Sequence, residues 1–126
     1  MSQEACRVLL CDDTPEIRLI LRTLLGLETE MEVVGEARNG LEAVRLVEEH
    51  RPDVVVLDLS MPVMDGFEAI PEIARVSPET SIVMYSAHGS SEIQAKAKRL
   101  GAHHFVQKGG DPMDVVESVQ EECAAG

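Results

Sequence analysis

Short apolar runs alternate along the chain with longer stretches that carry a helical period, and no other feature of the sequence constrains the fold as strongly. The five apolar runs span residues 8–11, 32–35, 54–57, 82–85 and 105–106. The first stretch between them carries one apolar stripe at helical spacing, formed by Ile17, Ile20, Leu21, Leu24 and Leu25. Five strands alternating with five helices predict an α/β fold, a (βα)5 chain whose parallel sheet is covered on both faces.

The other four stretches show the same helical period. Their apolar residues are Ala43, Val44 and Val47; Ile70, Ile73, Ala74 and Val76; Ile93, Ala97 and Leu100; and Val115, Val116, Val119 and Cys123. Thr14-Pro15 predicts a helix start, with threonine as the cap and proline at the first helical position. Pro71 falls about five residues into the third predicted helix, where it removes one helical hydrogen bond and should kink or delay that helix.

Length and charge limit the classes of protein that the chain can represent. It has 126 residues and is predicted to be one domain, residues 1–126, whose last residues resemble a fraying end or the start of a removed linker. With 11 basic and 23 acidic residues its net charge is −12, which disfavours direct binding to nucleic acid or to an anionic membrane. Aromatic residues make up only 2 %, too few to stack on bases or flat cofactors.

The sequence also indicates a compartment. No apolar run approaches the roughly 18–20 residues needed to cross a bilayer, and residues 1–4 lack the basic region of a signal peptide. We therefore expect a cytoplasmic protein. Cys6, Cys11 and Cys123 are odd in number and lack the spacing of metal-binding or redox pairs, so reduced, mostly buried thiols are expected.

Polar residues follow four of the predicted strands, at the point where each strand ends. Asp12-Asp13 follow the first strand, Asp58 the third, Ser86 the fourth and Lys108 the fifth. Because sites in open parallel sheets form outside the carboxyl ends of the strands, these side chains should converge on one edge. Three carboxylates held close repel one another unless a cation neutralises them, and oxygen ligands suit Mg²⁺.

These side chains form a coherent site for phosphoryl transfer. Asp58 ends the central strand of the expected order 2-1-3-4-5 and is the best nucleophile, because a carboxylate can attack phosphorus to form an acyl phosphate. Mg²⁺ at Asp12 and Asp13 would offset the charge that develops during transfer. Lys108 would supply positive charge from the other side, and Ser86 would donate a hydrogen bond to a phosphoryl oxygen.

Several motifs together resemble the receiver (CheY-like) domain of two-component response regulators. They are VLLCDD at residues 8–13, DVVVLDLSMP at 53–62, MDG at 64–66, Ser86-Ala87, and GAHHFVQK at 101–108. The likeness covers essentially the whole chain and includes the family's order of elements. It implies a flavodoxin-like three-layer sandwich with the parallel strand order 2-1-3-4-5.

The resemblance also implies roles for the acidic residues and the lysine. Asp58 is then the phosphoacceptor. Mg²⁺ is bound by Asp12, Asp13, the Asp58 carboxylate and, by position, the backbone carbonyl of Ser60. Lys108 matches the lysine of the family's catalytic site.

A second group of positions would respond to phosphorylation. Ser86 matches the family's switch hydroxyl and Phe105 its switch aromatic. In this family the hydroxyl moves toward the phosphate and the aromatic turns inward, which repacks the surface around the fourth helix and fifth strand. Ser60 and His88 stand two residues beyond Asp58 and Ser86, at positions that tune how fast water removes the phosphoryl group.

The end of the chain departs from the commonest family pattern. The family often has a proline after the lysine, joined by a cis bond, whereas here Lys108 is followed by Gly109-Gly110. A cis bond before glycine costs about 2.5–4 kcal/mol, so we expect a trans bond and a looser loop. With Asp111-Pro112 following, this ending resembles the NarL/LuxR-type subfamily, whose receivers precede a helix-turn-helix effector.

We therefore predict a phosphorylation switch of a two-component system rather than an enzyme that acts on a separate substrate. It would take a phosphoryl group from the phosphohistidine of a sensor histidine kinase and slowly dephosphorylate itself. Its output would go to an effector domain in the same chain, such as a helix-turn-helix domain for transcription regulation, or to a target protein. Whether it forms a homodimer, and whether it acts alone or within a longer regulator, stays open.

Three other functions fit parts of the sequence. A phosphatase of the haloacid-dehalogenase type also forms an aspartyl phosphate, but it needs an acid two residues after the nucleophile, where this chain has Ser60. A flavodoxin-like electron carrier needs a phosphate-binding loop and aromatic residues, where this chain has Asp12-Asp13. A degenerate receiver would signal by binding alone, although all five active positions carry usable chemistry.

Overall fold

One five-stranded sheet forms the centre of the computed structural model, which describes residues 4–125. The parallel strands follow the order β2-β1-β3-β4-β5, with β1 at Cys6–Cys11, β2 at Met31–Ala37, β3 at Val54–Leu57, β4 at Ser81–Ser86 and β5 at His104–Gln107. The helices are α1 (Pro15–Gly26), α2 (Gly40–His50), α3 (Gly66–Val76), α4 (Ser91–Leu100) and α5 (Met113–Ala125). The predicted α/β class, the alternation of strands and helices, and the flavodoxin-like strand order are confirmed.

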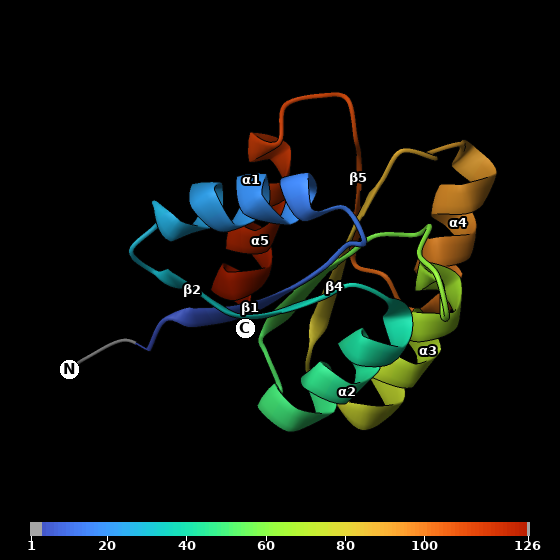
Figure 1. The fold of residues 1–126 in the computed structure, drawn as a ribbon, viewed down its shortest axis with the longest axis horizontal. Coiled ribbons are helices and arrows are strands. Elements are labelled where there is room, and N and C mark those ends of the chain that lie inside the picture. The colour runs from blue at the N-terminus through green and yellow to red at the C-terminus, as the bar shows by residue number, and fades with distance from the viewer. Residues whose placement is uncertain (1–3, 126) are drawn as a thin grey trace.

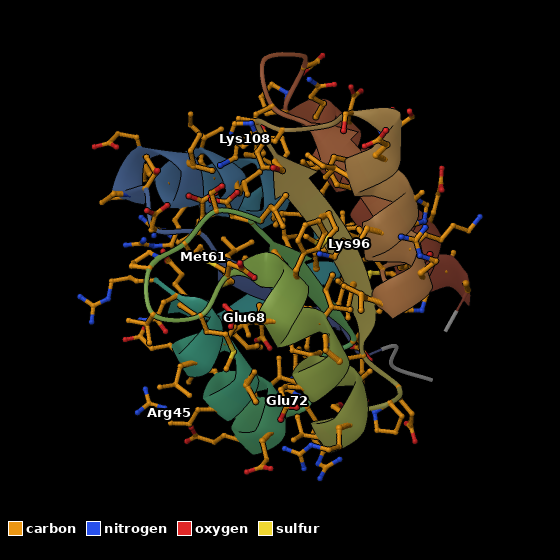
Figure 2. The ribbon with its side chains drawn as sticks, turned by 90° about the vertical axis from the view of Figure 1, so that its right-hand side faces the viewer. Arg45, Met61, Glu68, Glu72, Lys96 and Lys108 are labelled. Atoms are coloured by element: carbon orange, nitrogen blue, oxygen red, sulfur yellow. A yellow bond between two sulfur atoms is a disulfide. The ribbon has the colours of Figure 1, made fainter. Side chains whose placement is uncertain are left out.

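The helices cover the sheet on both faces, with α1 and α5 on one face and α2, α3 and α4 on the other (Figure 1). Successive side chains of a strand point to opposite faces, so a continuously apolar run supplies both halves of the core. In β1, Leu9 joins the apolar cluster under α2, α3 and α4, whereas Val8 and Leu10 join the cluster under α1 and α5. Figure 2 looks onto the three-helix face, where the ammonium of Lys96 on α4 lies 4.4 Å from the ring centroid of Phe67 on α3.

Side-chain caps begin three of the helices. The side chain of Asn39 accepts a hydrogen bond from the amide of Glu42 at the start of α2. Asp65 and Glu68 form a reciprocal capping box at the start of α3, each accepting from the other's backbone amide. At the start of α4, the hydroxyl of Ser90 accepts a hydrogen bond from the amide of Ile93. These caps satisfy backbone donors that the first turn of a helix leaves unpaired.

Three local expectations differ from the structure. The predicted delay of α3 is wrong, because the helix begins at Gly66 and continues through Pro71, which lies on its exposed side. Pro15 does occupy the first turn of α1, but the side chain of Thr14 makes no capping hydrogen bond. Ile20, predicted in the buried stripe of α1, is 44 % exposed.

The prediction of three reduced thiols is wrong for two of them. Cys6 at the start of β1 and Cys123 near the end of α5 form a disulfide, with their Cα atoms 5.8 Å apart. They stand 117 positions apart in the chain, so only the packing of α5 on the sheet brings them together. Cys11 is free and buried as expected, and burial raises the pKa of its thiol far above the usual value.

Within residues 4–125, none of the helices combines the length and the apolar character that crossing a bilayer requires. The predicted lack of a signal peptide rests partly on residues 1–3, and the predicted start of a linker rests partly on Gly126. These four residues lie outside the part of the chain that the structure describes.

Candidate functional site

The polar residues that follow the strands come together at one edge of the sheet. Backbone hydrogen bonds carry the strand pairing one residue further there. The amide of Asp58 donates to the carbonyl of Cys11 at 2.9 Å, and the amide of Lys108 donates to the carbonyl of Ser86 at 2.8 Å. These bonds align the carboxyl ends of neighbouring strands, so that the side chains just beyond the strand ends converge on one pocket.

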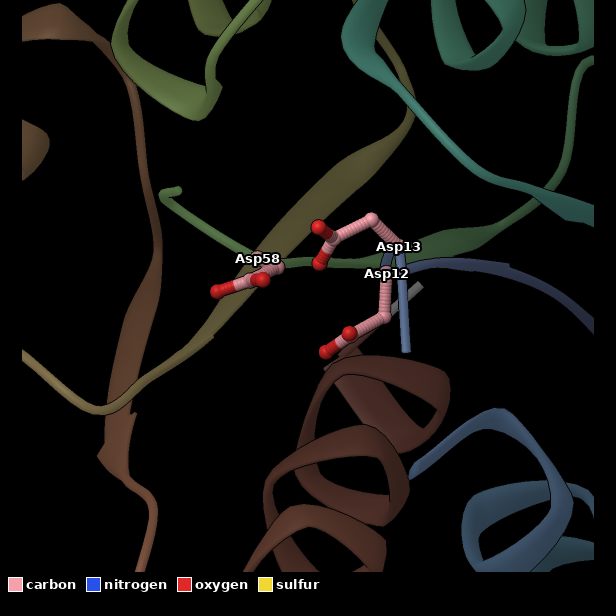
Figure 3. A group of neighbouring side chains, drawn as sticks. All are labelled: Asp12, Asp13 and Asp58. Atoms are coloured by element: carbon pink, nitrogen blue, oxygen red, sulfur yellow. The ribbon is translucent and has the colours of Figure 1, made fainter. Parts of the chain in front are cut away.

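Three carboxylates turn toward that space. Asp12 and Asp13 reach it from the end of β1, and Asp58 reaches it from the end of β3 (Figure 3). One oxygen of each lies within 4.8 Å of the others. Asp12 and Asp58 are only 3 % and 4 % exposed, whereas Asp13 is open to solvent.

Lys108 supplies the positive charge at this edge. Its ammonium donates to a carboxylate oxygen of Asp12 at 2.7 Å and lies 3.5 Å from a carboxylate oxygen of Asp58. Burial alone would lower the pKa of Lys108, but the hydrogen bond to Asp12 and the charge of Asp58 outweigh it and raise that pKa. The lysine is therefore held charged, next to the two buried acids.

One ammonium does not balance three carboxylates. Burial, and after it the negative charge of Asp12, raise the pKa of Asp58 from 3.8 to about 6, although Lys108 opposes this shift. The pocket thus carries excess negative charge. Carboxylate oxygens are the ligands that hard divalent cations such as Mg²⁺ prefer. The donor set fits such an ion, and the acidic triad is able to bind a metal as the sequence analysis expected.

The remaining predicted site residues differ in their exposure. Ser86 is fully buried, and its hydroxyl accepts a hydrogen bond from the amide of His88 at 3.1 Å. Phe105 on β5 is half-buried against the core cluster of the three-helix face. The side chains of Ser60 and His88 are exposed. The Ser86 hydroxyl therefore lies at the carboxyl end of β4, whereas the ring of Phe105 packs on the three-helix face.

The loop between β3 and α3 folds tightly against the site. The amide of Gly66 donates to the carbonyl of Leu59 at 2.7 Å, and a side-chain carbon at Gly66 would lie 2.5 Å from the carbonyl oxygen of Asp58. Glycine is therefore required at the start of α3. Val63, at the tip of the loop, has a φ of 69° and is 77 % exposed.

Sequence reasoning did not single out Arg18 or the backbone of Thr14 as parts of the site. The Thr14 amide donates to one carboxylate oxygen of Asp12 at 2.9 Å, and an Arg18 guanidinium nitrogen donates to the Asp12 carbonyl at 2.7 Å. The one sequence feature that could have indicated Arg18 was its position in the chain. Arg18 stands in the first turns of the helix that follows Asp12, on the side that meets Glu36 of β2.

Fold and site together define a class of protein. The family model described as "Response regulator receiver domain" matches residues 8–120, so the chain belongs to this family. It is a receiver domain whose acidic pocket of Asp12, Asp13 and Asp58 and whose Lys108 are consistent with phosphoacceptor signalling. The phosphatase and electron-carrier alternatives lose their support.

Its relatives include both short and long proteins. The chain is 38 % identical over 115 residues to the chemotaxis protein CheY of Thermotoga maritima, covering 91 % of this chain and 95 % of that one. It is 37 % identical over 114 residues to the uncharacterized transcriptional regulatory protein YhcZ of Bacillus subtilis, covering 90 % of this chain but only 53 % of that longer one. The signal receiver domain of the putative response regulator NarL from Mycobacterium tuberculosis superposes with a TM-score of 0.91 at 35 % identity, covering 98 % of this chain and 99 % of that one.

Proposed function

We propose that the chain is a phosphorylation switch that accepts a phosphoryl group on Asp58 from the phosphohistidine of a sensor histidine kinase. The observation that carries the proposal is the placement of Asp58, buried beside two further acids and 3.5 Å from the ammonium of Lys108. A carboxylate with a pKa of about 6 is largely ionised at neutral pH, as a nucleophile must be.

The residues divide the chemistry between them. A carboxylate oxygen of Asp58 forms a bond to phosphorus while the bond from phosphorus to the imidazole nitrogen breaks, and the electron pair stays on that nitrogen. Lys108 faces the acceptor oxygen and offsets charge on the transferred group. The Ser86 hydroxyl would donate to a phosphoryl oxygen. No separate substrate is turned over, and water later hydrolyses the acyl phosphate.

The acidic pocket supports a requirement for Mg²⁺. The proposed ligands are Asp12, Asp13, the Asp58 carboxylate and the backbone carbonyl of Ser60. When bound, the ion neutralises the carboxylates and the phosphoryl oxygens. The ammonium of Lys108 donates to Asp12 at 2.7 Å. The carboxylate of Asp13 is exposed, so it can approach a cation from the solvent side.

Output is proposed to run through Ser86 and Phe105. Movement of the Ser86 hydroxyl toward the phosphate would make room for the half-buried ring of Phe105 to turn inward, changing the surface of α4 and β5. The proposed readers are an effector domain, such as a helix-turn-helix domain in the same chain, or a separate target protein. We also propose a cytoplasmic location and a slow self-dephosphorylation tuned by the exposed Ser60 and His88.

Acetyl phosphate labelling with intact-mass measurement tests the proposal. In Mg²⁺ the protein should gain about 80 Da, the mass of one phosphoryl group, and it should gain nothing in EDTA. Asp58→Asn should abolish the gain in mass. The control is Asp53→Asn, which changes the aspartate just before the start of β3 and should leave the gain in mass intact. Undiminished labelling of Asp58→Asn would overturn the assignment. A wild-type protein that takes up no phosphoryl group at all would instead support the degenerate receiver.

A further inference from the structure

Arg18 links three elements around the first acid of the pocket. From α1, one guanidinium nitrogen donates to the backbone carbonyl of Asp12 at 2.7 Å, and the Nε donates to a carboxylate oxygen of Glu36 on β2 at 3.0 Å. The side chain of Arg18 is only 14 % exposed and that of Glu36 27 %. Arg22, one turn further along α1, bonds the other carboxylate oxygen of Glu36 but is 48 % exposed.

These contacts complete the fixation of Asp12. Its amide donates to the carbonyl of Ala37 at 3.0 Å. One carboxylate oxygen accepts from the amide of Thr14 and the other from the ammonium of Lys108. The carbonyl of Asp12 is the one remaining polar group of this residue, and among residues 4–125 its side-chain partner is Arg18. With that bond, every polar atom of Asp12 is held in place.

The bond matters because of where it acts. Asp12 is the residue at which the chain leaves β1 and turns toward α1, so rotation of its peptide plane would carry the carboxylates of both Asp12 and Asp13 with it. Arg18 reaches the backbone of this turn and not the carboxylate, so its influence is on position. Glu36 in turn fixes the guanidinium from the neighbouring strand, where Leu10 of β1 pairs with it.

We propose that Arg18, oriented by Glu36, is a positioning residue that sets the Asp12-Asp13 turn for binding a divalent cation. This inference rests on the proposed function, because it assumes that the acidic pocket takes Mg²⁺. Groups of this kind, which orient metal ligands without touching the metal, change metal affinity by about 10- to 100-fold when they are removed. The planar fork of arginine presents its donors in a fixed geometry to two separate acceptors, whereas the ammonium of lysine is a compact point charge at the end of a flexible stem.

Mg²⁺ titration calorimetry on the whole chain tests the inference directly, without any phosphoryl donor. Arg18→Met should weaken Mg²⁺ binding at least about tenfold. Arg18→Lys should restore part of the loss, and Glu36→Gln should fall between Arg18→Met and the wild type. The matched control is Arg22→Met, which also removes a partner of Glu36 but no contact to Asp12; it should bind within about twofold of the wild type.

Labelling by acetyl phosphate adds a second readout. If Arg18 only positions the turn, saturating Mg²⁺ should restore the labelling rate of Arg18→Met to near the wild-type value. Wild-type Mg²⁺ affinity in Arg18→Met, or an equal loss in Arg22→Met, would overturn the inference. If Arg18→Met does not fold, Arg18→Lys and Glu36→Gln decide in its place, and wild-type affinity in both would overturn it. A wild-type chain that neither binds Mg²⁺ nor labels would instead remove the proposed function, and this inference with it.

Discussion

Breaking the bond between Cys6 and Cys123 should cost the chain a large part of its stability. The bond closes a loop of 117 positions, nearly the whole chain. In the chain-entropy treatment of cross-links, a loop of this length contributes about 5 kcal/mol at 25 °C by restricting the unfolded state. Measured effects are often smaller, so we expect a loss of about 2–5 kcal/mol on reduction.

The loss translates into a change in melting temperature. A chain of 126 residues has an unfolding entropy of about 265 cal/mol/K. Reduction should therefore lower Tm by roughly 8–19 °C. Both cysteines line a surface cavity of about 600 Å³, so a small reductant can reach them.

The measurement is calorimetric or circular dichroism melting of the wild type with and without reductant, with free thiols counted by alkylation. The double variant Cys6→Ala/Cys123→Ala should melt like the reduced wild type, and reductant should not change it. The reasoning fails if complete reduction, shown by three alkylated thiols, shifts Tm by less than about 2 °C. It also fails if reductant destabilises the double variant as much as the wild type.

Three further changes probe the site itself. Folding raises the pKa of Asp58 to about 6, so the folded state holds the proton of this carboxyl more tightly than the unfolded state does. The stability of the wild type should therefore drop as pH rises from about 4 to about 6. In EDTA, Asp58→Asn should become more stable than the wild type by up to about 3 kcal/mol over that range, as measured by urea unfolding. Val63→Gly should stabilise the protein by about 0.5–1 kcal/mol, because it relieves a left-handed backbone at an exposed β-branched residue, and Val63→Asn should give part of that gain in the same assay. Gly66→Ala should lower the free energy of unfolding by at least about 2 kcal/mol in urea and weaken Mg²⁺ binding in calorimetry, because its Cβ would meet the Asp58 carbonyl. The control is Gly26→Ala, whose Cβ would meet no atom within 4 Å and which should be neutral or slightly stabilising.

Each of these has an opposing result. A stability difference between Asp58→Asn and the wild type that stays flat from pH 4 to pH 7 would mean that Asp58 titrates as an ordinary carboxyl. A destabilised Val63→Gly would mean that the valine side chain makes contacts worth more than the backbone strain. Equal behaviour of Gly66→Ala and Gly26→Ala would contradict the close approach of α3 to the end of β3.

The fold and the acidic pocket were predictable because both follow from local sequence and one topological rule. Periodicity assigned the elements, and the rule that parallel strands end at a common edge placed Asp12, Asp58 and Lys108 together. The features that escaped prediction depend on tertiary packing. The partner of Cys6 lies at the far end of the chain, and the bond from Arg18 to Asp12 depends on how α1 lies against β2.

The excess of two negative charges among Asp12, Asp13, Asp58 and Lys108 has a thermodynamic consequence. A divalent cation in the pocket would cancel it, and a phosphoryl donor would meet a neutral site instead of a repulsive one. Binding of the cation and loading of the phosphoryl group would then be linked, and linkage is reciprocal, so the loaded state must retain its cation more tightly than the unloaded state. If the proposed phosphoryl transfer takes place on Asp58, such a domain would respond jointly to the free concentration of the ion and to the supply of phosphoryl donor.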